Sequence, residues 1–563
     1  MSTPQKETGP ILVIGGSGVF GSRLAEGLCR DGVPDVIIAG RDLERARITA
    51  KRLGCRAIRF DMAAPDMARH LAELSPAIVI DAAGPFQSYA EDPYRLAKTA
   101  IRIGAHYLDL SDDGLFTQSI GTLDDDAKEA NVVVLSGVSS VPAISAAAVR
   151  AMAHDMPTPD LIESAILPGN RAPRGTSVFR AILAQVGRPI PGTDEIGWIG
   201  TERITIDTPE GQITRLASPI GAPDLLLMQS AFKAHDVRFL AGLELPLMHR
   251  GLGTLAWLVK HRALRSALPL TQVLLAAAKA LESLGSDQGG MRVRVVGTTT
   301  AGARVERTWS LLASAGDGPH VPGMPGRVLV RKLRQGQVAP GARPAIHDMT
   351  LTELQNAAPE RSLSFAQHES GWFPLFETCL GKDFTRLPPP VRALHAVVRQ
   401  RHWTGRAEIT RGPTGVARLI AALFRFPSAA KDVRVSVHMV RSGATETWTR
   451  HFADQRFRSH LTPDTSRPGR MWERFGPFRF AIDLQADATR LSYPVSAGTC
   501  FNVPLPKWLL PRRETHEAID DMGRATFDVA LSLPLAGLIV RYRGWLTPSD
   551  QPISGDQSPA AAS

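Results

Sequence analysis

The sequence predicts an α/β protein with three parts: a parallel sheet covered by helices, an α+β second domain, and an antiparallel, barrel-like β-rich domain. Apolar strand-like runs alternate with helical stretches over residues 10–144, and strand and helix candidates mix over residues 145–358. Short segments in which apolar and polar residues alternate fill residues 371–546. Uniformly apolar strands belong to sheets buried on both faces, whereas a period of two is typical of antiparallel strands.

The first region shows the most regular alternation of strands and helices. Its predicted strands are ILVIGG, DVIIAG, AIRFD, AIVIDAAG, HYLDLS and VVVLSG. Its predicted helices cover Phe20–Arg30, Leu43–Leu53, Met67–Leu74, Pro93–Ile103 and Leu123–Ala130. This order predicts successive βαβ units and therefore parallel strands.

The second region mixes both kinds of element. Its strand candidates are Leu161–Leu167, Arg203–Ile206, Arg292–Thr298 and Val305–Leu312. Between them, the Leu- and Ala-rich stretch Leu243–Leu284 predicts helices. The polar run Asn356–Ser370 then predicts an exposed linker to the last domain.

The last region consists of many short alternating segments separated by turn residues. The predicted strands are RAEIT, VRVSVHMV, TETWTRHF, RFRSHL, FRFAIDL, RLSYPV, RETHEAID, ATFDVALSL and LIVRYRGWL. One amphipathic helix, Val416–Phe424, interrupts them. Two interpretations of the interior stay open: a cavity lined by Trp448, Trp472 and Trp545, or a barrel filled by side chains. We predict that residues 1–9 and 547–563 are disordered.

Composition excludes several classes of protein. The chain has 563 residues, of which 44% are hydrophobic, and this is enough to form the hydrophobic cores of folded domains. Its longest apolar stretches are shorter than the ~20 residues that a bilayer crossing needs, and MSTPQKETGP lacks the apolar core of a signal peptide. The four cysteines show no CxxC spacing, which argues against a disulfide framework and a metal site. We therefore expect a cytoplasmic protein.

The net charge of +10 raises the question of an anionic partner. The Lys and Arg residues are scattered rather than clustered, so we expect no nucleic-acid partner. Peripheral contact of Leu243–Leu284 with a membrane surface stays open, as does a homodimer.

The strongest motif is Gly16-x-Gly18-x-x-Gly21, between a predicted strand and a predicted helix. Its glycines permit a tight turn, a close approach of the backbone to a pyrophosphate, and close packing of helix on strand. The helix N-terminus then offers free N–H groups to the phosphates. We predict a Rossmann-type domain in which the dinucleotide is bound by Gly15, Gly16, Ser17, Gly18, Val19, Phe20 and Gly21.

The residue after the second strand selects the cofactor. NAD enzymes usually place Asp or Glu there, to accept hydrogen bonds from the ribose, but this chain has Arg41, with Arg45 one helical turn further on. A guanidinium suits a 2′-phosphate, which favours NADP over NAD. The alternative is that Arg41 is a solvated loop residue and Asp42 an N-cap.

Two further segments follow strands at the edge of the sheet where ligands bind. Ala83, Gly84, Pro85 and Phe86 are candidates to lie along the ribose and nicotinamide, although Phe86 suits the core equally well. Ser139 is a candidate to bind cofactor or substrate, with a hydroxyl that stabilises a turn as the alternative.

Candidates for proton transfer are Tyr107 and Asp109, on one face of the HYLDLS strand. The alternative for each is a satisfied polar group in a packed sheet. Tyr94 and Lys98 match the Tyr-x-x-x-Lys spacing of short-chain dehydrogenases, but they follow the glycine motif too closely for that family's catalytic helix, and we discount them.

Several motifs together resemble the saccharopine dehydrogenase-like family of NAD(P)-binding oxidoreductases over about residues 10–360. They are GGSGVFG, AGRD, DAAGPFQ, GAHYLDLSDD, SGVSSVP, DQGGMRVRVVG and DGPHVPGMP. The C-terminal third resembles an uncharacterised bacterial domain that accompanies such Rossmann units. The resemblance implies NAD(P)-linked redox chemistry on diverse, often lipidic substrates. A multi-carboxylate substrate would need arginines that converge, for which Arg171, Arg174 and Arg180 are candidates.

We therefore predict an NADP-dependent oxidoreductase that transfers hydride to or from a small-molecule substrate, apolar or lipidic in character. The alternative is a sensor or scaffold that binds NADP(H) without turnover.

Overall fold

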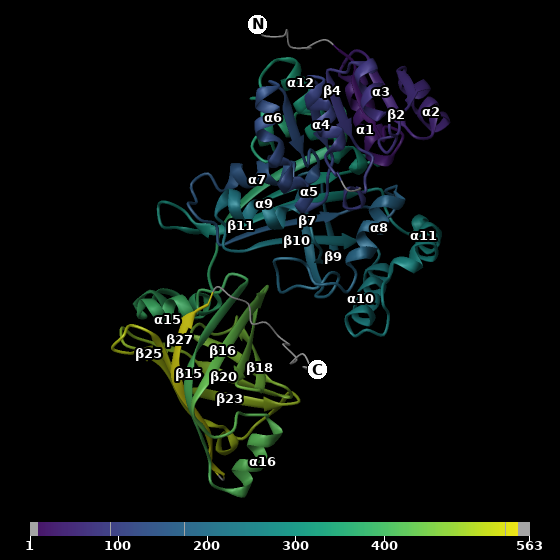
Figure 1. The fold of residues 1–563 in the computed structure, drawn as a ribbon. Coiled ribbons are helices and arrows are strands. Elements are labelled where there is room, and N and C mark those ends of the chain that lie inside the picture. The colour runs from purple at the N-terminus through teal and green to yellow at the C-terminus, as the bar shows by residue number, and fades with distance from the viewer. Residues whose placement is uncertain (1–8, 90–91, 174, 535, 550–563) are drawn as a thin grey trace, which may run out of the picture. The chain divides into compact units, whose positions relative to one another are not determined.

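The structure, a computed structural model, describes residues 9–89, 92–173, 175–534 and 536–549. The chain forms two compact units, and the boundary between them in the sequence falls between Gly371 and Trp372. The first unit contains two seven-stranded sheets and the second a thirteen-stranded sheet (Figure 1). These three sheets confirm the predicted fold class.

The first sheet is parallel throughout and has the strand order β13-β6-β5-β4-β1-β2-β3. Its strands are β1 (Ile11–Ile14), β2 (Val36–Gly40), β3 (Arg56–Arg59), β4 (Ile78–Asp81), β5 (His106–Asp109), β6 (Val133–Ser136) and β13 (Gly341–Pro344). In β1, Ile11 and Val13 pack into one core cluster, while Leu12 and Ile14 pack into another. Successive side chains of a strand point to opposite faces, so this sheet is buried on both.

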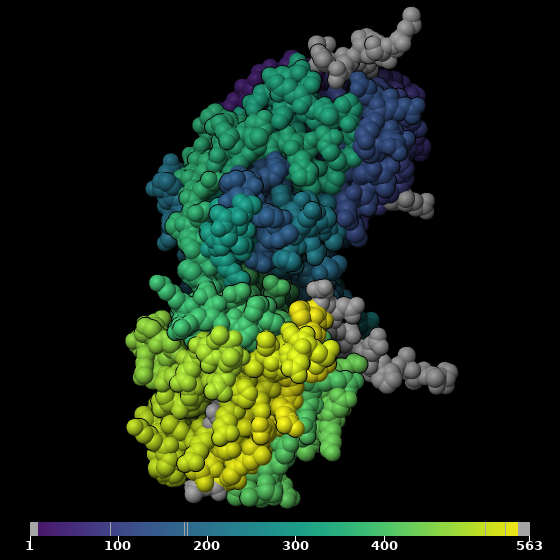
Figure 2. All heavy atoms as spheres, turned by 90° about the vertical axis from the view of Figure 1, so that its left-hand side faces the viewer, coloured from purple at the N-terminus to yellow at the C-terminus, as the bar shows by residue number. Residues whose placement is uncertain are grey.

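Helices cover both faces of the first sheet. They are α1 (Val19–Arg30), α2 (Leu43–Leu53), α3 (Met67–Leu74), α4 (Arg95–Arg102), α5 (Gly114–Ser119), α6 (Asp124–Glu129) and α12 (Met324–Arg334), whereas α7 (Ser145–Met152) lies against the second sheet. Figure 2 shows the green surface of the later segment, which includes α12 and β13, beside the blue surface of earlier residues on one face of this unit. A hydrogen bond from the Ala342 amide to the Asp124 carboxylate (2.9 Å) joins these two parts of the chain.

The second sheet is mixed and has the order β14-β12-β11-β7-β10-β9-β8. Its strands are β7 (Leu161–Leu167), β8 (Glu202–Thr208), β9 (Gly211–Pro219), β10 (Val237–Leu243), β11 (Gly289–Thr298), β12 (Arg304–Ala313) and β14 (Leu363–Gly371). The helices of this part are α8 (Thr176–Gln185), α9 (Pro223–Phe232), α10 (Pro246–Lys260), α11 (Thr271–Ala280) and α13 (Leu351–Gln355). The four strands predicted here are all present, and helices α10 and α11 fill the predicted helical stretch.

The prediction that Asn356–Ser370 is an exposed linker is wrong. Most of it is β14, which pairs with β12 over nine residues at the edge of the second sheet. Just before this strand, the Arg361 guanidinium pairs with Glu26 of α1 (2.6 Å) and with Asp317 (3.2 Å). The polar composition that suggested a linker reflects an edge strand with an exposed face and a set of half-buried ion pairs.

The chain also returns to the first sheet after completing most of the second. Strand β13, whose residues the sequence analysis placed in the second domain, pairs in parallel with β6. The short sequence GARP carries little apolar periodicity, so its membership of the sheet depends on the ladder with β6 rather than on local preference.

The second unit contains one antiparallel sheet. Its strands are β15 (Gln400–Arg411), β16 (Ala430–Ser442), β17 (Thr445–Phe452), β18 (Gln455–Pro463), β19 (Arg470–Phe475), β20 (Phe478–Asp483), β21 (Gln485–Ala486), β22 (Leu491–Ser492), β23 (Val495–Cys500), β24 (Val503–Pro504), β25 (Arg512–Ile519), β26 (Ala525–Leu533) and β27 (Gly537–Pro548). Its α-helices are α14 (Leu375–Leu380), α15 (Pro389–Leu394) and α16 (Gly415–Leu423). Pro548 still pairs with Trp403, so β27 extends into the stretch predicted to be a disordered tail.

A short segment closes this sheet on itself. Leu491 and Ser492 pair with β25, and the Tyr493 amide donates to the carbonyl of Thr515. A few residues later, Val495 pairs with Ile482 of β20. Because one segment bonds to strands from both ends of the sheet order, the sheet is barrel-like, as predicted.

Within the described residues, no helix is both long and apolar enough to cross a membrane.

Candidate functional site

The glycine motif forms a tight turn between β1 and α1. Gly15 has a φ of +73°, and a Cβ there would lie 2.6 Å from the backbone of Ala82 and Ala83. A Cβ at Gly21 would lie 2.4 Å from the carbonyl oxygen of Gly15. Glycine is therefore required at both positions by the close approach of neighbouring backbone.

Gly18 lies in a different environment. It precedes α1 with extended φ and ψ of −76° and 177°, and no side chain caps the helix. A Cβ at Gly18 would meet only the carbonyl oxygen of Gly15, at 3.1 Å. The uncapped N–H groups of a twelve-residue helix thus open onto space beside Gly18, which is the arrangement that holds a phosphate. These residues fit a dinucleotide pyrophosphate.

Arg41 follows β2 with an exposed side chain that has no hydrogen-bond or ion-pair partner among the described residues. Asp42 is the N-cap of α2, since its carboxylate accepts a hydrogen bond from the amide of Arg45 (3.1 Å). Ser17 lies beside the same strand end, with its hydroxyl oxygen 3.9 Å from where a Cβ of Gly40 would be. The N-cap role of Asp42 leaves the Arg41 guanidinium available to a ligand at this edge.

The segment after β4 contributes backbone rather than side chains to this edge. Ala83 and Gly84 are half-buried, and the Ala83 amide donates to the Asp81 carboxylate (3.0 Å). Phe86, however, is buried against the rings of Tyr89 and Phe116, each 5.1 Å away between centroids. Of the two interpretations of Phe86, the structure supports the core residue. Pro85 is half-buried next to it.

Ser139 follows β6 at the same edge of the sheet. Its side chain is half-buried, and its amide donates to the carbonyl of Gly137 (2.8 Å). Helix α8, which like α1 has no side-chain cap, begins near the glycine motif, because a Cβ at Gly175 would lie 3.7 Å from the Val19 side chain. The edge of the first sheet and the start of α8 therefore border the same region.

Asp109 is completely buried at the end of β5. One carboxylate oxygen accepts hydrogen bonds from the amides of Ser111 (3.0 Å) and Gly137 (2.9 Å) and from the Ser136 hydroxyl (2.8 Å). The other oxygen has no hydrogen-bond partner in the described structure. Burial raises the pKa of Asp109 to about 7, against the lowering effect of these donors.

A second buried carboxylate, Asp81, stands beside Asp109 at the end of the neighbouring strand β4. Its oxygens accept hydrogen bonds from the Ala83 amide and from the Tyr89 hydroxyl (2.8 Å). Burial raises the pKa of Asp81 to about 6. Two adjacent carboxyls with raised pKa values titrate as a pair and hold a proton near neutral pH.

Two tyrosines accompany this pair of carboxyls. Tyr107 is buried, and burial together with the charges of Asp109 and Asp81 raises the pKa of its hydroxyl. Tyr89 is half-buried and hydrogen-bonded to Asp81, and it connects the buried pair with the edge of the sheet. The sequence analysis named Tyr107 and Asp109 but missed Asp81 and Tyr89. Two features of the sequence could have identified them: Asp81 ends an apolar strand, and Tyr89 follows it by eight residues.

The raised pKa values predict how stability depends on pH. In the folded state, Asp81 and Asp109 bind protons more tightly than in the unfolded chain, so stability falls as pH rises from about 4 to about 7. We expect Asp109→Asn to flatten this fall, with a gain on the order of 2–4 kcal/mol at about pH 8 relative to the unsubstituted protein. Thermal melting across this pH range measures the effect. Asp42→Asn, at an exposed N-cap, is the control, and an unchanged slope in Asp109→Asn would contradict the assignment.

Other residues considered in the sequence lie elsewhere. The Tyr94 hydroxyl donates to the carbonyl of Phe116 (2.7 Å), and Lys98 pairs with Asp92 (2.8 Å), so they do not form a catalytic pair. Arg171 donates to the carbonyl of Ser283, and Arg180 is exposed on α8. Arg171 is thus engaged with the backbone, and Arg174 lies outside the described residues.

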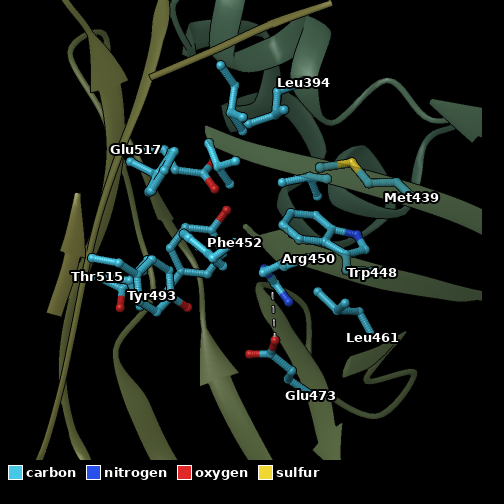
Figure 3. A pocket seen from close by; sticks show the side chains of 16 residues that line it. Leu394, Met439, Trp448, Arg450, Phe452, Leu461, Glu473, Tyr493, Thr515 and Glu517 are labelled. Atoms are coloured by element: carbon cyan, nitrogen blue, oxygen red, sulfur yellow. Dashed lines mark ion pairs between the residues drawn. The ribbon is translucent and has the colours of Figure 1, made fainter. Parts of the chain in front are cut away.

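The closed sheet of the second unit contains a small internal cavity of about 40 Å³. In Figure 3, Arg450, Glu473, Tyr493 and Glu517 point into it. Arg450 lies 4.7 Å from the Trp448 ring centroid and 3.8 Å from the Glu473 carboxylate. As the side chains stand, this volume suits a few water molecules.

Among the described residues around this cavity, Trp448 is the one tryptophan of the predicted three that lines it. Trp545 lies on the outer face, where the Arg524 guanidinium stacks 4.1 Å from its ring, and the Arg479 guanidinium stacks 4.2 Å from the ring of Trp472. The interior is therefore closer to the filled alternative than to a ligand-sized cavity.

Comparison with known proteins identifies two parts of the chain. Residues 11–135 match the saccharopine dehydrogenase NADP binding domain, and residues 387–546 match a domain of unknown function, DUF4166. No curated protein matches the chain significantly.

Several solved structures are similar to part of the chain at low sequence identity. Apo saccharopine dehydrogenase (L-Glu forming) from Saccharomyces cerevisiae is 14% identical, with a TM-score of 0.46, and the match covers 64% of this chain and 100% of that one. The WlbA dehydrogenase from Thermus thermophilus, in complex with NAD and α-ketoglutarate, is 11% identical, with a TM-score of 0.28 and coverage of 62% and 92%. Biliverdin reductase from Synechocystis, in complex with biliverdin and NADP+, is 10% identical, with a TM-score of 0.29 and coverage of 62% and 96%.

The glycine turn, the uncapped helix and the parallel sheet agree with the matched model and support a dinucleotide-binding oxidoreductase, in which residues 11–135 are similar to the saccharopine dehydrogenase NADP binding domain and residues 387–546 are similar to DUF4166.

Proposed function

We propose that this protein is an NADP-dependent oxidoreductase that reduces or oxidises an apolar small molecule at the carboxyl edge of its first sheet. The observation that carries the proposal is the junction of three features at that edge. They are the phosphate cradle at Gly18, the free guanidinium of Arg41, and the buried carboxyl pair reached through Tyr89. The match to an NADP-binding domain supports the choice of cofactor class.

Different residues of the chain would bind the cofactor and transfer the proton. Gly15–Gly21 would hold the pyrophosphate, Arg41 would pair with the 2′-phosphate, and the backbone around Ala83 and Gly84 would contact the ribose and nicotinamide. The bound nicotinamide supplies or accepts the hydride. In the direction of reduction, Tyr89 would give its proton to the substrate atom that becomes negative and would take one from the protonated form of Asp81.

The raised pKa of the Tyr89 hydroxyl restricts how this relay works. Burial and the Asp81 charge raise that pKa, so a free tyrosinate is unfavourable at neutral pH. Tyr89 therefore acts as a neutral relay that gains a proton from the carboxyl pair as it releases one. Ser139, half-buried at the same edge, would hydrogen-bond the substrate or the nicotinamide amide.

The cofactor preference is tested by titration of NADPH and NADH while protein fluorescence is followed. We expect tighter binding of NADPH, and we expect Arg41→Ala to weaken NADPH binding by roughly ten- to a hundredfold with little change for NADH. This corresponds to the loss of one charge-assisted pairing, about 1.5–3 kcal/mol. Arg47→Ala, on helix α2 just after Arg41 and paired with Glu44, is the matched control. Equal affinities for both cofactors, or an unchanged preference in Arg41→Ala, would contradict the assignment.

A further inference from the structure

One end of the closed sheet in the second unit exposes an unusual number of large apolar side chains. On α16, Val416, Leu419 and Leu423 are 55%, 71% and 75% exposed. Their spacing of three and four residues places them on one stripe of the helix. The opposite stripe, with Ala417 and Ala421, is fully buried. The helix is thus fixed to the sheet by one face and presents a second apolar face outward.

The chain between β23 and β25 adds aromatic residues to the same end. Phe424, directly after α16, packs on Phe478 (5.3 Å between ring centroids). Phe478 pairs with Cys500, so the tight turn that follows lies close to the helix. In this turn and just after it, Phe501, Val503 and Trp508 are 79%, 66% and 60% exposed. We call the exposed residues Val416, Leu419, Leu423, Phe501, Val503 and Trp508 the α16 patch.

The chain around the α16 patch is positively charged. Residues 409–431 contain four Lys or Arg residues and no Asp or Glu, and residues 488–513 also contain four and none. Arg418, Arg425 and Lys507 are exposed beside the patch. An apolar stripe with exposed aromatics and a basic margin is the pattern by which an amphipathic helix lies in the interface of an anionic bilayer.

We propose that the α16 patch docks the protein on a membrane surface that contains anionic lipid. The leucines and aromatic rings enter the boundary between headgroups and acyl chains, and Arg418, Arg425 and Lys507 contact the lipid phosphates. The helix lies in the plane of the surface and does not span the bilayer, because nine residues are too few. The proposal does not depend on cofactor chemistry in the first unit.

A second apolar surface, on α10 and α11, is the alternative location for this contact. Leu247 and Trp257 of α10 are exposed, and this helical stretch is also basic. The Trp257 ring, however, already packs against His261, 4.4 Å away between centroids. The α16 patch combines three exposed aliphatic residues on one stripe with two exposed aromatics, so it is the stronger site.

Co-sedimentation with vesicles tests the proposal on the full chain. We expect the protein to bind vesicles of phosphatidylcholine and phosphatidylglycerol, and to bind pure phosphatidylcholine at least about tenfold more weakly. The double variant Leu419→Ser/Leu423→Ser and the single variant Trp508→Ser should each lower binding by at least about tenfold. Lys507→Glu should lower it by about fivefold or more and reduce the preference for anionic lipid.

The matched control is Leu247→Ser/Trp257→Ser, which removes the same kind of exposed side chains from α10. It should bind vesicles like the unsubstituted protein, and far-UV circular dichroism should show that all variants are folded. The proposal fails if the unsubstituted protein does not bind anionic vesicles, if the α16 variants bind them equally well, or if only the α10 variant loses binding. It also fails if the α16 substitutions abolish self-association of the protein in the absence of lipid but leave its binding to vesicles unchanged.

Discussion

Gly18→Val is expected to abolish binding of the dinucleotide while the protein stays folded. The extended φ and ψ at Gly18 are accessible to valine, and its Cβ would meet only one carbonyl oxygen, at 3.1 Å. The branched side chain would instead fill the space beside the uncapped N-terminus of α1, where the backbone must approach the pyrophosphate. We expect at least a roughly thousandfold loss of NADPH affinity, equivalent to about 4 kcal/mol, in a fluorescence titration.

Gly21→Ala provides the contrast for this experiment. Its Cβ would lie 2.4 Å from the Gly15 carbonyl, so it should lower the melting temperature, whereas Gly18→Val should change it little. If folded Gly18→Val protein retained NADPH binding, the phosphate would have to be held elsewhere.

Tyr89→Phe should lower kcat by about 10²–10⁴-fold and leave the affinity for NADPH unchanged. The substitution removes the hydroxyl that links the edge of the sheet to Asp81 and keeps the ring that packs on Phe86. Asp81→Asn should have a comparable effect, because it removes the proton store behind Tyr89. The measurement is steady-state oxidation of NADPH on a substrate that supports turnover.

Tyr94→Phe is the matched control for this prediction. Tyr94 packs on the same Phe116 ring, but its hydroxyl bonds to a backbone carbonyl and not to the carboxyl pair. This variant should lose some stability and keep its kcat. Equal kcat values for Tyr89→Phe and the unsubstituted protein would exclude Tyr89 from proton transfer.

Much of the first sheet could be predicted from the sequence because its physics is local. Apolar strands such as Ile11–Ile14, the glycine turn, and the helix from Val19 to Arg30 each carry their signal within a few residues. Strands β13 and β14 could not be predicted in this way. The β13 sequence GARP pairs with β6, which lies about two hundred residues earlier in the chain. Strand β14 is a polar edge strand whose pairing with β12 determines its structure.

The site shows the same division between local and distant information. The glycine cradle and Arg41 follow from residue type and position next to a strand. The pairing of Asp81 with Asp109 depends on the order of strands in the sheet, and the contact between Tyr89 and Asp81 depends on how the following turn folds back. The alternative role of Asp42 as an N-cap, proposed from the sequence, is confirmed by its bond to the Arg45 amide.

The most direct test of the central claim is transfer of deuterium from NADPH labelled at C4 of the nicotinamide. The protein is incubated with both stereoisomers of the labelled cofactor and a bacterial lipid extract, and the products are analysed by mass spectrometry. Our account predicts that one stereoisomer delivers its deuterium to an apolar product as NADP+ accumulates, and that Tyr89→Phe slows this transfer. If NADPH binds tightly but both stereoisomers keep their deuterium in the presence of the extract, the protein is a cofactor-binding sensor or scaffold and the proposed hydride transfer is wrong.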